Sequence, residues 1–112
     1  MQEIAQTIIN SLEEKKAENI LLMDINSLSS FTDYFIVCTG TSDRMLDALA
    51  DAVVKSVNEK HSIKGRIEGT SQSGWVLIDF GSILVHIFSP DQRDYYQLEK
   101  LWHEGKIILH VQ

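Results

Sequence analysis

Residues 75–102, WVLIDFGSILVHIFSPDQRDYYQLEKLW, decide the fold. Two apolar segments flank Gly81-Ser82, a two-residue link that favours a β-hairpin. Pairing Phe80 with Ile83 across this turn fixes the register of the two strands. One face of the hairpin then carries only apolar side chains, those of Val76, Ile78, Val85 and Ile87. We expect this first face to be core.

The opposite, second face of the hairpin is also mostly apolar. The same register makes three cross-strand pairs there, namely Trp75 with Phe88, Leu77 with His86, and Asp79 with Leu84. A hairpin that is apolar on both faces is expected near the centre of a sheet that is covered on both sides. Asp79 and His86 are the polar exceptions.

Other elements follow from apolar periodicity and turn signals on either side of the hairpin. Helices are predicted over 2–16, over 43–60 with Ser42 as N-cap, and from Ser89-Pro90 to near Gly105. Strands are predicted over 20–25 and 34–39, with a short edge strand near 66–68, and the tail 106–112 is apolar enough to add a strand or dock on a neighbour. This order predicts one α/β domain over 1–112, a mixed sheet flanked by helices.

The composition indicates which class of partner the protein binds and in which cellular compartment it is found. The 112 residues include 16 acidic and 10 basic side chains, and the net charge of -6 disfavours a protein that binds phosphate backbones. A basic partner is expected instead, with no direct nucleic-acid binding. The single cysteine, Cys38, lies in an apolar run and is expected to be a small buried hydrophobe in a reducing compartment. No apolar run or leader suggests a membrane span or export, so the expected localisation is cytoplasmic.

An enzyme is the main rival to a binding protein. Gly40-Thr41-Ser42 resembles the glycine-serine turn of nucleotidyltransferases, so Ser42, Asp43 and Asp79 with magnesium would be the candidate site. However, the turn lacks a Walker lysine, and Asp43 would repel phosphate. Asp43, Asp47 and Asp51 are spaced by four on a predicted helix, which is typical of a solvated face rather than of carboxylates that converge on two metal ions.

Two further catalytic patterns are weaker. Asp79 and His86 could form a triad with Ser42 or Ser73, but the chain has no GxSxG elbow and the two are not directly opposed. A hydrogen-bonded structural histidine is the better interpretation of His86. His86, His103 and His110 have no metal-ligand spacing. We therefore expect no catalytic residues, no metal and no cofactor.

The remaining signal is a concentration of residue types that anchor protein interfaces. Five occur within 28 residues: Trp75, Arg93, Tyr95, Tyr96 and Trp102. Because one helix stripe cannot bury all of those on the third helix, part of the set is expected to be exposed, and Trp, Tyr and Arg dominate binding hot spots. This favours a protein-docking role. A self-associating module is the third possibility, since an exposed aromatic patch can also form a symmetric dimer.

Several motifs together resemble the ribosomal silencing factor family, also called Iojap-like. They are Asp33-Tyr34-Phe35, Gly40-Thr41-Ser42-Asp43-Arg44, Glu68-Gly69, Gly74-Trp75, Leu77-Ile78-Asp79-Phe80-Gly81, Val85-His86-Ile87-Phe88, and residues 93–102 with the pattern RxYYxLExLW. The resemblance covers nearly the whole chain. Phe80 stands where the family often has tyrosine, and the tail after Trp102 follows no family pattern.

The resemblance implies a fold related to nucleotidyltransferases without their catalytic carboxylates. It also implies binding to the large ribosomal subunit through ribosomal protein fourteen, and a steric block to joining of the small subunit that represses translation when nutrients are limited. A homodimer is compatible with the family. Our hypothesis places six residues at or beside the partner: Trp75, Asp79, Tyr95, Tyr96, Glu99 and Lys100. His86 and Trp102 are expected to support them.

Overall fold

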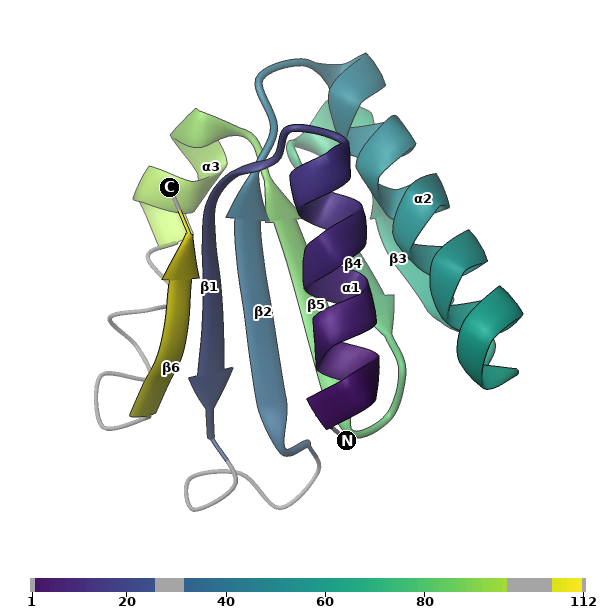
Figure 1. Ribbon diagram of the computed structural model, residues 1–112. Coiled ribbons are helices and arrows are strands. Elements are labelled where there is room, and N and C mark those ends of the chain that lie inside the picture. Colours follow the sequence, from purple (N-terminus) through teal and green to yellow (C-terminus); the bar gives the residue numbers. More distant parts are fainter. Residues whose placement is uncertain (1, 26–31, 97–105, 112) are drawn as a thin grey trace.

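The structure is a computed structural model that describes residues 2–25, 32–96 and 106–111. Its strands form one six-stranded sheet in the order β3-β4-β5-β2-β1-β6 (Figure 1). The elements in chain order are α1 Gln2–Glu14, β1 Glu18–Asp24, β2 Tyr34–Thr39, α2 Asp43–His61, β3 Arg66–Thr70, β4 Trp75–Asp79, β5 Ile83–Phe88, α3 Pro90–Tyr96 and β6 Lys106–Val111. Strands β2 and β5 are parallel and the other neighbours are antiparallel. The predicted mixed α/β sheet is confirmed.

The β4–β5 hairpin has the register that the sequence predicted. Trp75 is opposite Phe88 and Asp79 is opposite Leu84, and the N–H of Phe80 donates to the carbonyl of Ile83 at 3.0 Å. Gly81 in the turn has a φ of 85°, which suits glycine. The first face is core, because its four apolar side chains are at most 2% exposed. Helices α1 and α2 lie side by side over this face (Figure 1).

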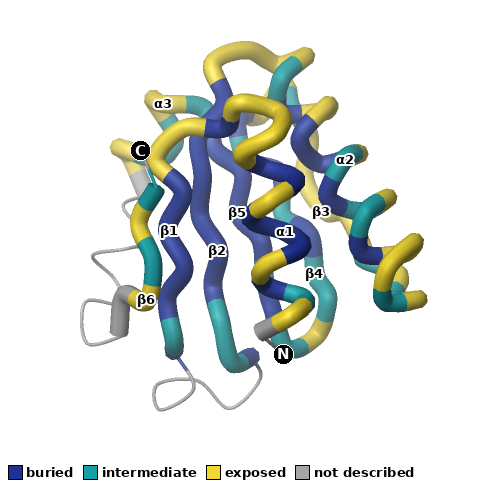
Figure 2. The backbone as a smooth tube through the Cα atoms, in the orientation of Figure 1, coloured by how far each residue is buried: buried dark blue, intermediate teal, exposed yellow. Residues whose placement is uncertain are grey.

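The expectation that both hairpin strands are covered on both sides is correct for β5 and wrong for β4. On the second face of β5, His86 and Phe88 are buried, and Leu84 near the turn is half-buried. On β4, by contrast, Trp75, Leu77 and Asp79 are only half-buried. The reason is position, because β4 is next to β3, a five-residue edge strand in which every residue is exposed (Figure 2). The second face of β4 is therefore partly open to solvent.

The ends of the other elements agree closely with local signals. Ser42 caps α2, because its Oγ accepts from the N–H of Met45 at 3.1 Å, and the helix ends one residue later than predicted. Helix α1 ends at Glu14, before a turn in which Lys16 has a φ of 70°. The tail forms β6, which pairs antiparallel with β1. The predicted end of the third helix near Gly105 lies outside the described residues.

The interior of β2 contains Cys38, which is completely buried. Burial raises the pKa of its thiol to about 12, so at neutral pH it is an uncharged apolar side chain, as the sequence indicated. Within the described ranges, no helix has the length and apolar character needed to cross a bilayer.

Candidate protein-docking surface

The side chain of Trp75 is held by two residues of β5. Its indole N–H donates to Nδ1 of His86 at 3.2 Å, and its ring lies over Phe88 with 5.0 Å between centroids. The rings of His86 and Phe35 are in a T-shaped arrangement, with 4.7 Å between their centroids. These contacts fix the orientation of Trp75 while leaving the side chain half-buried. His86 is thus a hydrogen-bonded structural histidine, as expected, and its partner is Trp75.

The protonation state of His86 follows from the same contacts. Burial lowers the pKa of His86 to about 4, so the imidazole is neutral at pH 7. Since Nδ1 accepts from Trp75, the single ring proton must be on Nε2. This Nε2 is buried and has no hydrogen-bond partner in the part of the chain that the structure describes. Among the described residues the His86 ring bonds only to Trp75 and to no carboxylate or hydroxyl, so these residues do not form the arrangement of a catalytic triad around it.

Three side chains form a row along the second face of β4. Trp75, Leu77 and Asp79 alternate with core residues, so the row is about 13 Å long at 3.3 Å per residue. Their antiparallel partners on β3 are Thr70, Glu68 and Arg66, respectively. Two strands therefore contribute to one surface. It carries an aromatic ring, an aliphatic side chain and charged groups.

A hollow of about 260 Å³ lies beside this row. Five residues line it: Glu68, Gly69, Ser73, Trp75 and Leu77. Gly69 has a φ of 83°, and a Cβ there would lie 2.4 Å from the carbonyl oxygen of Trp75. Only glycine therefore allows β3 to approach β4 this closely. We call this feature the Trp75 hollow.

The charged groups at the open end of the row are already paired with one another. Nη2 of Arg66 lies 3.3 Å from an oxygen of Glu68 and 3.3 Å from Oδ2 of Asp79. Oδ1 of Asp79 also accepts from the N–H of Gly81 at 2.7 Å. Asp79 thus stabilises the hairpin turn in addition to any role towards a partner.

Helix α3 lies over the second face and is anchored by Arg93. Nη1 of Arg93 donates to the carbonyl of Asn19 at 2.6 Å and to Oγ1 of Thr39 at 2.9 Å. Thr39 shares its face of β2 with Phe35 and Val37, which belong to the second core cluster. Arg93 is therefore a structural anchor. Tyr95 on the same helix is 78% exposed.

The proposed partner-binding set is only partly within the described residues. Trp75 and Asp79 lie on one face of β4, and Tyr95 is exposed on α3. The backbone of Tyr96 ends α3, but its side chain is not described, and Glu99 and Lys100 lie outside the described residues. The same holds for Trp102. Placement at the partner remains a hypothesis for all six.

The residues of the candidate enzyme site do not come together in the structure. Ser42 and Asp43 follow the end of β2 that pairs with Phe88, whereas Asp79 pairs with Leu84, four residues away along β5. They therefore lie towards opposite ends of the sheet. Asp43, Asp47 and Asp51 are exposed on α2, as expected for a solvated helix face. Among the residues described, no group of three or more metal-ligating side chains comes together, and His103 is not among them.

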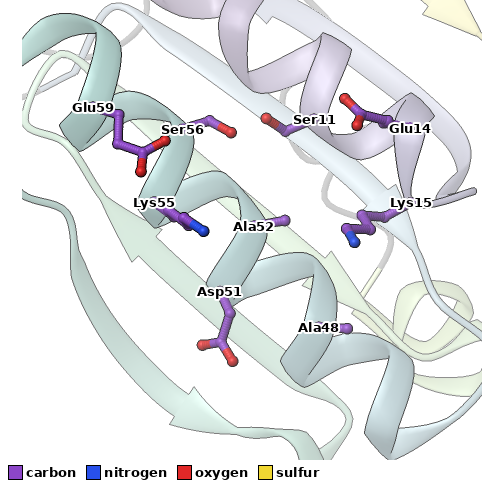
Figure 3. Close-up of a pocket in the computed structure, with 9 residues that line it drawn as sticks. All are labelled: Ser11, Glu14, Lys15, Ala48, Asp51, Ala52, Lys55, Ser56 and Glu59. Carbon is purple, nitrogen blue, oxygen red and sulfur yellow. The ribbon is translucent and has the colours of Figure 1, made fainter.

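A second depression, of about 380 Å³, lies between α1 and α2 (Figure 3). Both signs of charge alternate along it, with Glu14 at the end of α1, Lys15 in the turn that follows, and Asp51, Lys55 and Glu59 from α2. Small side chains such as Ala48 and Ala52 also line it. This depression has no aromatic side chain in its lining and no dominant sign of charge. The Trp75 hollow has both an aromatic side chain, Trp75, and a negative charge, Glu68.

Leu77 and Glu68 are two residues of this surface that the sequence alone did not indicate. Leu77 was placed on the second face by the hairpin register, and its half-burial became visible only once the neighbouring strand was known to be an exposed edge. In the sequence, Glu68 stands out only as part of the Glu68-Gly69 motif. The cross-strand pair of Glu68 with Leu77 explains why that motif lies beside Trp75.

Fold and surface together define a small α/β domain with an aromatic and acidic face suited to docking on another protein. The model of the family described as "Ribosomal silencing factor during starvation" matches residues 1–112. The chain is 37% identical to the ribosomal silencing factor RsfS of Halalkalibacterium halodurans over 107 residues, which covers 96% of this chain and 92% of the relative. It is 38% identical to RsfS of Bacillus subtilis over 95 residues, 85% of this chain and 80% of the relative.

A solved structure agrees with these sequence matches. A crystal structure of a Chromobacterium violaceum protein superimposes with a TM-score of 0.87 at 38% identity, covering 92% of this chain and 86% of that one. This chain belongs to the ribosomal silencing factor family, as its motifs predicted. Its class of function is therefore regulation of translation in association with the ribosome.

Proposed function

We propose that this chain binds the large ribosomal subunit through ribosomal protein fourteen and sterically prevents the small subunit from joining. Translation then falls when nutrients are limited. The observation that carries the proposal is the partly open second face of β4, where Trp75 and Leu77 are half-buried beside an edge strand. Tyr95, 78% exposed on α3, adds a second aromatic side chain for a partner to cover.

The proposed mechanism requires only that the protein occupies its site on the large subunit, and no chemical reaction. A standard interface covers about 800 Å² on each partner, which is about an eighth of the 6379 Å² surface of this domain. A protein docked beside the intersubunit face would exclude the small subunit by volume alone. Inhibition then follows mass action and depends on the concentrations of the factor and of free large subunits.

Charge supports a protein partner over RNA. With a net charge of -6, and with the carboxylates of Glu68 on β3 and Asp79 on β4, the domain would repel a phosphate backbone and attract a basic ribosomal protein. We therefore propose that ribosomal RNA contributes no major contact, and that the protein acts in the cytoplasm, where the subunits are.

Self-association is a competing use of apolar surface. On β6, the edge strand at the other end of the sheet, Ile108 is 49% exposed and borders a depression with Ile9, Leu22 and Leu109. A homodimer formed there would leave the row on β4 open. A homodimer formed through Trp75 and Tyr95 would compete with the ribosome. Light scattering with and without large subunits distinguishes the two arrangements.

The test compares two aliphatic truncations on neighbouring strands. Leu77→Ala removes contact area from the proposed surface, whereas Ile67→Ala removes a similar area from β3, whose partner Ile78 lies on the first face. We expect Leu77→Ala to weaken co-sedimentation with isolated large subunits about tenfold and Ile67→Ala less than about twofold. Tyr95→Ala, at an exposed position, is expected to weaken it as well. Equal affinity of all variants, each with its fold verified by circular dichroism, would show that the surface is wrongly placed.

A further inference from the structure

The Trp75 hollow presents only one kind of polar group to a ligand. The indole N–H of Trp75 is directed to His86, and the Ser73 hydroxyl donates to the carbonyl of Thr70 at 2.7 Å. The side-chain groups of the hollow that can still take a new partner are therefore acceptors, and the charged one is the carboxylate of Glu68, whose side chain is 51% exposed. An apolar floor with one charged acceptor at its rim suits a cation on an aliphatic stem.

In the free protein this carboxylate faces Arg66. Nη2 of Arg66 bridges Glu68 and Asp79 at 3.3 Å each, but its side chain is 74% exposed. Ion pairs this exposed contribute little, because water and salt screen them and a long side chain must be immobilised. Asp79 keeps its bond to the N–H of Gly81 whether or not Arg66 is present. Replacement of Arg66 by another cation would therefore cost little.

We propose that the Trp75 hollow receives one arginine or lysine side chain of the protein partner, and that this side chain replaces Arg66 as the ionic partner of Glu68. This inference rests on the proposed function, since it names the chemistry of the same docking surface. The aliphatic stem packs on Leu77, the cationic head lies against the ring of Trp75, and Glu68 accepts its hydrogen bonds. Phosphate would meet the Glu68 carboxylate instead, so nucleic acid does not fit.

Arg66 then has a specific role as an internal competitor. Its single positive charge offsets one of the two negative charges of Glu68 and Asp79 when no partner is bound, which lowers the affinity of the face for basic proteins in general. Only a partner that also covers Trp75 and Leu77 gains enough contact to displace it. A basic protein whose shape does not fit the row on β4 can form only a weak, solvent-exposed ion pair with Glu68.

The test uses the full chain and isolated large ribosomal subunits, with affinity measured by co-sedimentation. Glu68→Gln removes the acceptor charge, and its control is Glu59→Gln, which removes the same charge from exposed α2 on the other side of the sheet. Arg66→Gln removes the competitor, and its control is Arg44→Gln, also exposed on α2. All four sites are exposed, so unfolding is not expected to obscure the result.

We expect Glu68→Gln to weaken binding about tenfold and Glu59→Gln less than about twofold. Arg66→Gln is expected to tighten binding about threefold, because an exposed ion pair no longer has to be broken, and Arg44→Gln is expected to leave it nearly unchanged. If the wild type binds and Glu68→Gln matches its control, or if Arg66→Gln weakens binding, the assignment of the hollow is wrong while the proposed function stands. If the wild type does not bind large subunits, both fail.

Discussion

The buried histidine that holds Trp75 makes the stability of this domain sensitive to mild acid. Burial lowers the pKa of His86 to about 4, whereas in the unfolded chain it returns to its ordinary value of 6.5. Between these values the unfolded chain binds a proton that the folded protein excludes. Stability contributed by His86 is therefore complete above pH 6.5 and is lost as the pH falls towards 4.

The size of the effect follows from the two pKa values. Linkage gives a loss of about 1.4 kcal/mol between pH 7.5 and pH 5.5, and about 3 kcal/mol once the pH is below 4. Protonation of Nδ1 would also remove the acceptor of the Trp75 indole N–H. Acid should therefore weaken the docking surface along with the fold.

Urea unfolding followed by tryptophan fluorescence at pH 7.5, 6.5 and 5.5 measures this loss directly. The control is His86→Gln, which is less stable at pH 7.5 but lacks the titrating group. Its free energy of unfolding should therefore fall by about 1.4 kcal/mol less than that of the wild type over the same interval. Parallel pH dependence in the two proteins would refute the assignment of the shifted pKa to His86.

Three further outcomes are expected. The Cys38 thiol, with its pKa raised to about 12, should react with a thiol reagent at neutral pH only as fast as the protein unfolds, and fast labelling in native conditions would contradict its burial. Gly69→Ala should cost about 2 kcal/mol or more in thermal unfolding, because its Cβ would meet the Trp75 carbonyl oxygen at a φ of 83°. Arg93→Ala should cost about 1–3 kcal/mol by loosening α3 from Asn19 and Thr39, and an unchanged melting temperature would show that these bonds contribute nothing.

Local rules in the sequence were sufficient to predict the register of the β4–β5 hairpin and the start of α2. The two-residue turn at Gly81-Ser82 and the alternation on either side of it left one register that buries Val76 and Ile78 together. Ser42 marked the start of α2 because its side chain satisfies an amide that the helix cannot. In both cases the decisive contacts join residues close together in the chain.

Exposure of the candidate site depended on contacts that the sequence does not specify. Whether the second face of β4 was covered depended on β3 being an edge strand, and on where α3 crosses the sheet. The partner of His86 was a diagonal neighbour, Trp75, although the register had placed Leu77 directly opposite. Arg93, grouped with interface residues by its type, is a structural anchor because its partners come from β2 and from Asn19 in β1.

Assembly of ribosomes from separated subunits tests the central claim most directly. Purified protein is added to isolated large subunits before small subunits, and complete ribosomes are measured by light scattering or on a sucrose gradient. If the domain docks on the large subunit and excludes the small one, complete ribosomes should decrease as the protein approaches one copy per large subunit, and Leu77→Ala should require a higher concentration. An unchanged yield of complete ribosomes at saturating excess of the wild type would contradict the account.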